Sequence, residues 1–276
     1  MATILDDILA DTKTLVTHRK REFPRSSLLA MEHSERPRLA FADALRGDDL
    51  RFIAEVKKAS PSKGVIREDF RPTDIAQRYA DGGAAAISVL TEPKYFQGSL
   101  DYLEAIRRVV EVPLLRKDFI LDPHQIEEAR AYGADAILLI AAALERPHLI
   151  DLLDAAKEIG VACLVELYDA DEIEKIDFDR VEVLGVNNRD LRTFTVDIDH
   201  SLRVFEQIAE RTDADVVRVS ESGLRSADDL AYLRRNGIDA VLIGETFMRA
   251  PNPGVALADA RLAVAQRLAT DETLAS

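Results

Sequence analysis

From about residue 50 onward, short runs of apolar and β-branched residues alternate with longer stretches in which apolar residues recur at helical spacing. The predicted strands are 51–56, 84–90, 112–117, 135–140, 161–166, 181–187, 216–221 and 239–243. The predicted helices lie near 73–82, 99–110, 123–132, 146–159, 170–176, 199–211, 226–236 and 254–268. Eight strands, each followed by a helix, predict an α/β protein built as a single (β/α)8 barrel, that is, a TIM barrel.

A weak internal repeat supports this interpretation. The segments 82–89, 133–140 and 237–244 each begin with glycine, pass through a short turn and continue as a buried strand. The same junction used three times indicates one repeated unit of strand and helix. The alternative is an open, doubly wound sheet, but the number of strands and the chain length favour closure.

Residues 1–49 follow a different pattern. Apolar or small side chains at positions 4, 5, 8, 9, 12, 15 and 16 predict one amphipathic helix. The basic segment 18–21 follows, and then a polar stretch that contains Pro24 and Pro37. We expect 1–49 to be an N-terminal helical extension packed on the barrel of residues 50–276, with some contact to the active site and one domain overall.

Composition narrows the class of protein. The chain has 276 residues, 47% of them hydrophobic, and a net charge of −14, which argues against nucleic acid or an anionic membrane as a partner. It has no run of 18 apolar residues, so we expect no membrane span. The acidic N-terminus lacks a signal-peptide pattern, and Cys163 is the only cysteine. We therefore expect a cytoplasmic protein without disulfides.

Charged or amide side chains stand at the carboxyl ends of five predicted strands. They are Glu55, Lys57, Lys117, Glu166, Asn187 and Glu221. In a (β/α)8 barrel these strand ends meet at one mouth, where active sites lie. A single charged strand end is more often a solvated rim residue or a structural ion pair, but a whole ring of them is hard to explain in that way. Amino and carboxyl groups crowded into one cavity suit acid–base catalysis.

A second signal indicates phosphate binding. Ser222-Gly223 follows the strand at 216–221, and Gly244-Glu245 follows the strand at 239–243. Loops after the last two strands of such barrels often bind phosphate through backbone N–H groups, although these glycines alone would also suit tight turns. Local positive charge could come from Lys57, Lys58 and Lys63, or from Arg116 with Lys117. The loop from Ser60 to Gly64 is a candidate lid.

Metal, cofactor and cysteine chemistry are not expected. The five histidines are scattered and none stands at a strand end. Cys163 lies in the middle of a predicted strand, where it suits the core better than a nucleophilic role. No glycine-rich nucleotide-binding motif occurs in the chain.

Several of these segments together resemble the indole-3-glycerol phosphate synthase family. The matching segments are Ile53–Gly64, Leu115–Ile120, Leu164–Glu166, Gly185–Leu191 and Ser220–Leu224. The resemblance spans the barrel and the N-terminal extension, and no candidate catalytic position departs from it. Glu245 stands in a phosphate loop where other members carry serine. That change would keep a backbone N–H contact to phosphate but remove a hydroxyl contact.

The resemblance implies the substrate 1-(2-carboxyphenylamino)-1-deoxyribulose 5-phosphate, whose ring closes, loses CO2 and then loses water. It implies Lys117 as the acid in ring closure, Lys57 as the carboxylate-binding group and a candidate dehydration acid, and Glu166 as the partner in dehydration. Glu55 would orient the lysines, while Asn187 and Glu221 would hold the anilino and hydroxyl groups. The remaining implied contacts are Ser60, Ser222, Gly223, Gly244 and Glu245 for phosphate, and Phe96, Phe119, Leu138, Leu191 and Arg189 around the aromatic ring.

Two other functions compete with this one. A phosphoribosylanthranilate isomerase would share the phosphate site, but it needs a Cys/Asp acid–base pair at strand ends, where this chain has Glu55 and Lys57. A non-catalytic sugar-phosphate sensor would be supported by loss of a charged strand end, and none is lost. We expect a monomer with one barrel and one activity. Weak association with other tryptophan-pathway enzymes stays open. The sequence also leaves open how the acid roles are divided between Lys57 and Lys117.

Overall fold

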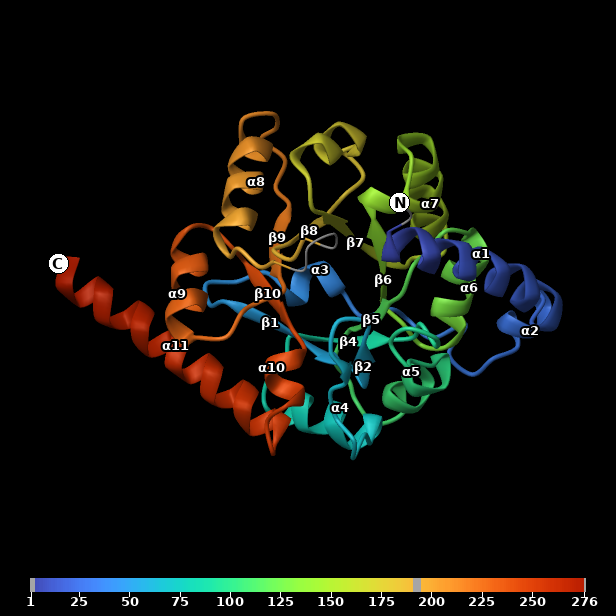
Figure 1. Cartoon of the computed structure of the whole chain (residues 1–276), viewed down its shortest axis with the longest axis horizontal. Coiled ribbons are helices and arrows are strands. Elements are labelled where there is room, and N and C mark those ends of the chain that lie inside the picture. The colour runs from blue at the N-terminus through green and yellow to red at the C-terminus, as the bar shows by residue number, and fades with distance from the viewer. Residues whose placement is uncertain (1–2, 191–194, 276) are drawn as a thin grey trace.

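Eight parallel strands close into a barrel in the computed structural model of this protein, which describes residues 3–190 and 195–275 (Figure 1). The barrel strands are β1 (Arg51–Val56), β4 (Ala86–Leu90), β5 (Leu114–Lys117), β6 (Ala136–Ile140), β7 (Ala162–Leu167), β8 (Val183–Asn187), β9 (Val217–Glu221) and β10 (Ala240–Ile243). Each strand pairs with its neighbours in chain order, and β10 pairs with β1 to complete the ring. The predicted (β/α)8 barrel is confirmed and the open sheet is excluded.

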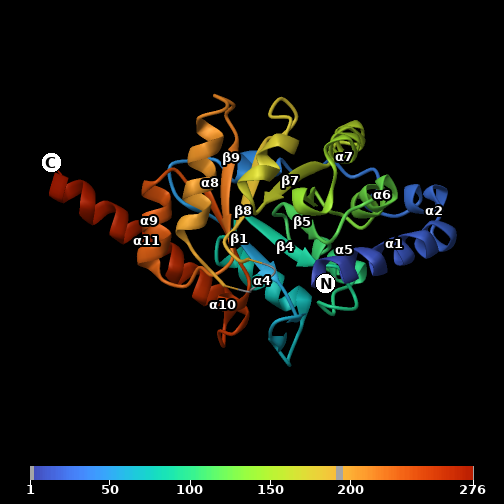
Figure 2. The same ribbon diagram turned by 45° about the horizontal axis from the view of Figure 1, so that its top comes forward.

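Helices connect successive strands and cover the outside of the barrel. They are α4 (Pro72–Asp81), α5 (Leu100–Arg107), α6 (Pro123–Ala131), α7 (Arg146–Glu158), α8 (Asp199–Ala209), α9 (Ala227–Arg235), α10 (Glu245–Met248) and α11 (Pro253–Ala275), with 3₁₀-helices η1 (Ala141–Ala143) and η2 (Ala170–Lys175). The helix predicted near 170–176 is thus a 3₁₀-helix. The last helix runs beyond the predicted residue 268, and Figures 1 and 2 show its end extending past α9.

The predicted strands begin one or two residues too early in most cases. The residues ahead of them, such as Ala84 and Val181, are buried and apolar but belong to the turns that enter the barrel. At the three repeated junctions, Gly83, Gly133 and Gly237 have φ of +83°, +91° and +83°, so each ends its helix in the left-handed conformation that glycine adopts without strain. The repeated unit predicted from these glycines is therefore present.

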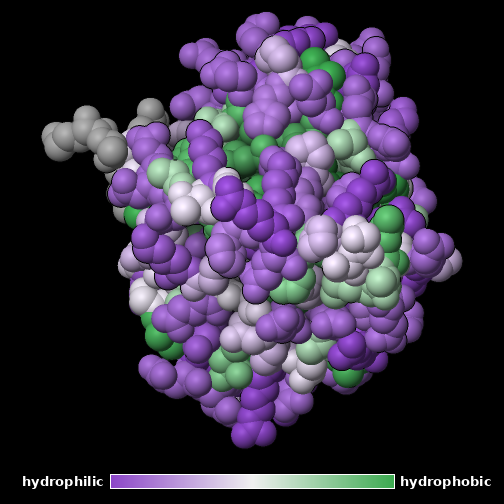
Figure 3. All heavy atoms as spheres, turned by 90° about the vertical axis from the view of Figure 1, so that its right-hand side faces the viewer, coloured by the Kyte–Doolittle hydropathy of each residue, from purple (hydrophilic) through white to green (hydrophobic). Residues whose placement is uncertain are grey.

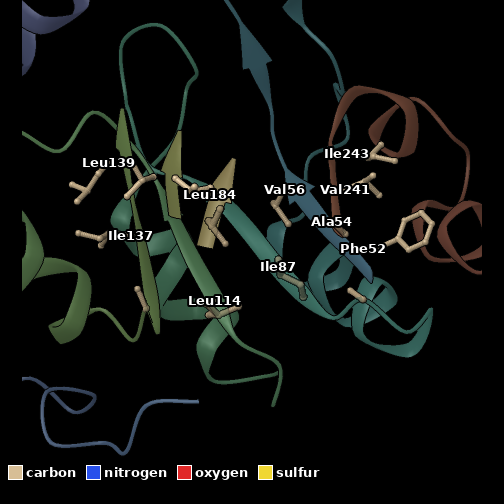
Figure 4. Close-up of a cluster of buried hydrophobic side chains, with 14 of the residues drawn as sticks. Phe52, Ala54, Val56, Ile87, Leu114, Ile137, Leu139, Leu184, Val241 and Ile243 are labelled. Atoms are coloured by element: carbon tan, nitrogen blue, oxygen red, sulfur yellow. The ribbon is translucent and has the colours of Figure 1, made fainter. Parts of the chain in front are cut away.

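Side chains of the strands alternate between two apolar clusters. Phe52, Ala54 and Val56 of β1 point outward, and Figure 4 shows them with outward residues of the other strands, in the layer that packs against the helices. Ile53 of the same strand points inward and joins the cluster that fills the barrel. Because Glu55 has the inward parity of Ile53, the alternation carries its carboxyl group into the barrel mouth.

The N-terminal residues contribute three helices: α1 (Ile4–Glu22), α2 (Arg25–Leu29) and α3 (Phe41–Ala44). A capping box between Thr3 and Asp6 begins α1. Ion pairs from α1 to residues beside the barrel strands include Lys94–Asp11 and Lys20–Asp122, each 2.6 Å long. Along α1 the predicted apolar face is correct at Ile8, Thr12 and Val16, which are buried, but Leu15 is exposed.

Helix α3 packs its apolar side chains into the amino-terminal end of the barrel. Phe41, Ala42 and Leu45 belong to the interior cluster with Ile53 and Leu115. In the view of Figure 1, α3 appears within the ring of strands. This short helix was not predicted, because four residues are too few to show a helical period.

The connection from β1 to α4 contains a small hairpin where an irregular loop was expected. Strand β2 (Ala59–Ser60) pairs antiparallel with β3 (Gly64–Val65). Gly64 has φ of +63°, which a proline cannot adopt. The Ser60-to-Gly64 segment is therefore a turn held between two paired ends rather than a free loop.

The face of the molecule that carries α1 and α2 is mostly polar (Figure 3). Figure 3 shows the side of the molecule on which α1 and α2 lie, where hydrophilic residues predominate and hydrophobic residues are interspersed. In the described part of the chain, no helix combines the length and the apolar character that crossing a bilayer would need.

Candidate active site

A cavity of about 570 Å³ opens at the carboxyl ends of the barrel strands. That size is typical of small-molecule sites. Every site residue predicted from the sequence lines it except Leu191, which lies outside the described residues. The lining members are Glu55, Lys57, Ser60, Phe96, Lys117, Phe119, Leu138, Glu166, Asn187, Arg189, Glu221, Ser222, Gly223, Gly244 and Glu245. The fold thus brings these side chains together from opposite sides of the ring.

Lys117 lies at the centre of the charged groups. It is the last residue of β5, and its Nζ donates to Oε2 of Glu221 at 2.7 Å and to Oε2 of Glu166 at 3.2 Å. Burial alone would lower the pKa of Lys117, but these two carboxyl groups raise it above its ordinary value. Glu55 adds to the effect. The ammonium form of Lys117 is therefore strongly favoured at neutral pH.

Glu221 ends β9 and is almost completely buried. Burial, together with nearby Glu166, raises its pKa to about 8, against the opposing charge of Lys117. Its Oε1 is buried and has no hydrogen-bond partner among the described residues. A carboxyl group that keeps its proton near neutral pH can donate a hydrogen bond, so Glu221 can act as a donor to a ligand.

A second ion pair lies across the mouth. Lys57 Nζ is 2.6 Å from Oε2 of Glu55, and both side chains are mostly buried. Burial would raise the pKa of Glu55, but Lys57 and then Lys117 lower it below its ordinary value. Glu55 is therefore a carboxylate, and its pairing holds the Lys57 ammonium at the edge of the cavity.

One side of the cavity is apolar. The rings of Phe96 and Phe119 lie 6.2 Å apart at an interplanar angle of 40°, beside Leu138. Sequence analysis missed several other apolar residues that line the cavity, namely Ile4, Leu5, Ile8, Leu90, Ile140 and Leu242. Some contact between the N-terminal extension and the active site was expected, and the first turns of α1 supply it through Ile4, Leu5 and Ile8. This apolar wall can hold an aromatic ring.

The other side is polar and built from two turns. Ser222 and Gly223, which follow β9, both have left-handed backbones with φ of 71° and 77°. Gly244 and Glu245 follow β10, and Glu245 Oε1 lies 2.9 Å from Nε of Arg249. Burial would raise the pKa of Glu245, but Arg249 and the nearby lysines lower it. Sequence analysis missed the cavity residues Arg225 and Arg249, whereas Ser62 lies within the candidate lid and Thr246 directly follows Glu245 in the predicted phosphate loop.

Some of the predicted positive patch lies elsewhere. Arg116 points out of the barrel, where Nη1 donates to the Gln125 carbonyl at 2.6 Å and Nη2 binds Asp118 at 2.9 Å. Neither Lys58 nor Lys63 lines the cavity. Only Lys57 and Lys117 of the predicted patch face it, because strand alternation turns Arg116 to the opposite side of β5 from Lys117.

Groups suited to metal or thiol chemistry lie outside the cavity. In the described ranges, one group with metal-ligating potential brings donor atoms of Glu32, His33 and Glu104 within 4.8 Å of one another. Both glutamates already pair with Arg108, at 3.3 and 2.7 Å. Cys163 packs against the outer core cluster, and burial raises the pKa of its thiol to about 12. Neither arrangement contributes to the cavity described above.

Comparison with known proteins gives a consistent set of relatives. A family profile described as "Indole-3-glycerol phosphate synthase" matches residues 5–259. An indole-3-glycerol phosphate synthase of Salinibacter ruber is 56% identical, covering 94% of this chain and 95% of that protein. Another, of Rhodopirellula baltica, is 46% identical, with coverage of 92% and 97%. The structure of 3-hexulose-6-phosphate synthase from Salmonella typhimurium matches the fold at a TM-score of 0.59 and 13% identity, covering 79% of this chain and 99% of that one.

Proposed function

The chain belongs to the indole-3-glycerol phosphate synthase family, and we propose that its cavity converts 1-(2-carboxyphenylamino)-1-deoxyribulose 5-phosphate into indole-3-glycerol phosphate. The enzyme is accordingly a carboxy-lyase of tryptophan biosynthesis that acts on a sugar phosphate. Its reaction closes a ring, releases CO2 and releases water. The observation that carries the assignment of residues is the position of Lys117, an ammonium between two glutamates, with an apolar wall on one side and polar turns on the other.

Ring closure needs a proton donor at the ribulose carbonyl, because attack by the aromatic carbon leaves an alkoxide. We assign this role to Lys117, whose ammonium lies at the centre of the cavity. Its raised pKa makes the Lys117 ammonium a weak acid. It is nevertheless a stronger acid than the alcohol, so it can protonate the alkoxide. Glu221 and Glu166 keep the ammonium oriented and are placed to return a proton to it.

Lys57 is assigned to the substrate carboxylate. Its ammonium is paired with a single carboxylate, Glu55, and faces the cavity, so it can contact a second anion there. Once the carboxyl group leaves as CO2, the same ammonium is free to protonate the departing hydroxyl group during dehydration. Glu166 would take the proton that the new five-membered ring loses when dehydration makes it aromatic.

The two walls hold the two ends of the substrate. The aromatic ring would lie between Phe96, Phe119 and Leu138, with Arg189 near its edge. The phosphate would lie against the turns at Ser222-Gly223 and Gly244-Glu245, with Ser60 reaching it from the hairpin. Asn187 would hold a hydroxyl or anilino group. Fixing both ends aligns the reacting carbons, which is the main difficulty of the closure step.

We further propose that residues 3–49 are a helical extension of one domain with the barrel, and that the enzyme acts as a cytoplasmic monomer without a cofactor. The ion pairs of α1 and the packing of α3 in the interior cluster support the first point. Weak association with other enzymes of the pathway is compatible with this proposal.

Product formation tests the proposed function directly. The chain contains no tryptophan, so indole fluorescence can be followed without a tryptophan background. Incubation with the carboxyphenylamino substrate should produce that fluorescence together with an equal amount of CO2. Phosphoribosylanthranilate supplied alone should not be consumed. Folded protein that consumed phosphoribosylanthranilate but not the carboxyphenylamino compound would contradict the proposal and favour the isomerase.

A further inference from the structure

Two glycines beside the charged groups occupy positions where the backbone does not demand glycine. Gly185 lies inside β8 and is not among the residues with a positive φ. Gly244 follows β10 and has a negative φ of −117°. Residues with side chains also adopt negative φ values. The reason for glycine at these positions must therefore be the space around them.

The space beside Gly185 is filled by a carboxyl group. A Cβ built on Gly185 would lie 2.3 Å from Oε1 of Glu221 and 3.2 Å from Cδ1 of Leu164. Gly185 is also in register with Glu166 on the neighbouring strand. Strand β8 therefore separates the strands that carry the two glutamates, and the missing side chain lets Glu221 lean across it to share Lys117 with Glu166.

The space beside Gly244 is filled by the other ion pair. A Cβ on Gly244 would lie 2.3 Å from Oε2 of Glu55 and 3.1 Å from Nζ of Lys57. That oxygen is the one that binds the Lys57 ammonium. Gly244 was predicted as a phosphate contact through its backbone N–H, and its lack of a side chain serves the Glu55–Lys57 pair independently of that contact.

We propose that Gly185 and Gly244 are positioning residues of the active site, because each leaves room for a glutamate side chain to reach its lysine. In either alanine variant the atom that must yield is the tip of the glutamate side chain, since the backbone around it is fixed by the barrel. The strand survives, but the carboxyl group moves away from the ammonium. The predicted effect of these two glycines on catalysis rests on the proposed function. Their predicted effect on the positions of Glu221 and Glu55 does not.

A pair of double-mutant cycles in urea unfolding tests the space argument without any substrate. Gly185→Ala should lower the unfolding midpoint in the wild-type background and leave it unchanged or raised in the Glu221→Ala background, where the space is empty. Gly244→Ala and Glu55→Ala should couple in the same way. The crossed pairs, Gly185→Ala with Glu55→Ala and Gly244→Ala with Glu221→Ala, serve as controls and should be additive. Equal effects of each alanine in both backgrounds would overturn the proposal.

The catalytic readout separates positioning from loss of structure. Gly185→Ala should reduce kcat by about tenfold or more and shift its pH profile, since even a displacement of about 1 Å can cost a factor of ~100. In the Glu221→Ala background it should cause no further reduction. Val186→Ala, on the outer face of the same strand, should lower stability but keep kcat and its pH profile.

A Gly185→Ala enzyme with wild-type kcat and pH profile would contradict the positioning role. If the wild-type protein itself forms no indole product, the proposed function fails. The unfolding cycles still decide whether Gly185 and Gly244 make room for Glu221 and Glu55, so the two failures are distinguishable.

Discussion

At the scale of single residues, the ionisation of Glu221 has a direct consequence for stability. Burial raises its pKa in the folded protein from 4.5 to about 8. Between these values the folded state holds a proton that the unfolded state has released, so stability falls as the pH rises through this window. Replacing the group with one that does not titrate should remove that loss.

We therefore expect Glu221→Gln to gain stability relative to the wild type as the pH rises from about 5 to about 8. The Lys117 ammonium stays charged throughout this range, so it does not add a second titration. Urea unfolding midpoints measured at several pH values for both proteins give the comparison. If the midpoints of the two proteins changed in parallel across this pH range, Glu221 would be ionised to the same extent in the folded and unfolded states, which would contradict the prediction.

Arg249 offers a second prediction for single residues, at the phosphate end. It pairs with Glu245, which is a carboxylate close to the proposed phosphate position. Removing the arginine should leave that charge to repel the phosphate. We expect Arg249→Ala to raise KM by about tenfold, corresponding to about 1.4 kcal/mol of binding, with little change in kcat.

The double variant Glu245→Gln/Arg249→Ala is the matched control. It removes the repelling carboxylate together with the arginine, so its KM should return toward the wild-type value. Steady-state kinetics with the carboxyphenylamino substrate measure both. An unchanged KM in Arg249→Ala would place the phosphate away from this pair.

The sequence predicted only part of how the charged side chains of the site pair with one another. The sequence placed Glu55, Lys117 and Glu166 at strand ends, because strand parity and barrel closure follow from local patterns. It could not show that Lys117 pairs with two glutamates, or that Glu221 extends over Gly185. Those contacts depend on barrel curvature and on which side chains are missing from neighbouring strands.

At the scale of elements, α3 closes the amino-terminal end of the barrel. Phe41 is 1% exposed and packs with interior residues of the strands. We expect Phe41→Ala to destabilise the protein by about 3–5 kcal/mol, because the vacated space lies among fixed strands that cannot collapse into it. Urea unfolding measures the change.

Leu29→Ala is the control for that experiment, because Leu29 is an apolar residue of α2 that is 53% exposed. Its effect should stay within about 0.5 kcal/mol. A loss for Phe41→Ala no larger than that of Leu29→Ala would mean that α3 does not close the barrel in solution.

Two elements were not predicted from the sequence, and the physical reason is the same for both. The hairpin of β2 and β3 has two residues in each strand, and α3 has four residues, so neither is long enough to show a period. Both are specified by what they pack against. The long elements from β1 to α9 were predictable because each carries its own apolar pattern, although buried turn residues such as Ala84 shifted their starts.

At the scale of the whole molecule, the N-terminal segment and the barrel are tied by buried contacts. Arg36 binds the buried Asp135, which also pairs with Arg107 at 3.1 Å, and Arg19 binds the buried Glu128. Severing the pairs with Arg36 and Arg19 would remove one partner from each of these buried carboxylates, which is unfavourable. The segment should therefore not unfold separately from the barrel.

We expect one cooperative unfolding transition for a monomer of 30.6 kDa, with no dependence on protein concentration. Far-UV circular dichroism follows the helices of both parts, and tyrosine fluorescence follows local environments, so their urea midpoints should coincide. Two separated transitions would show that residues 3–49 form an independent unit.

The central claim concerns the whole assembly of strands: that the cavity carries out ring closure with the Lys117 ammonium as acid. Indole fluorescence from the carboxyphenylamino substrate, compared among the wild type, Lys117→Ala and Lys157→Ala, tests it most directly. Lys157 is exposed on α7 and outside the cavity, so its variant should match the wild type. Lys117→Ala should remain folded and lose a factor of about 10²–10⁴ in kcat, as expected for a lost general acid. Full activity in folded Lys117→Ala would contradict the claim.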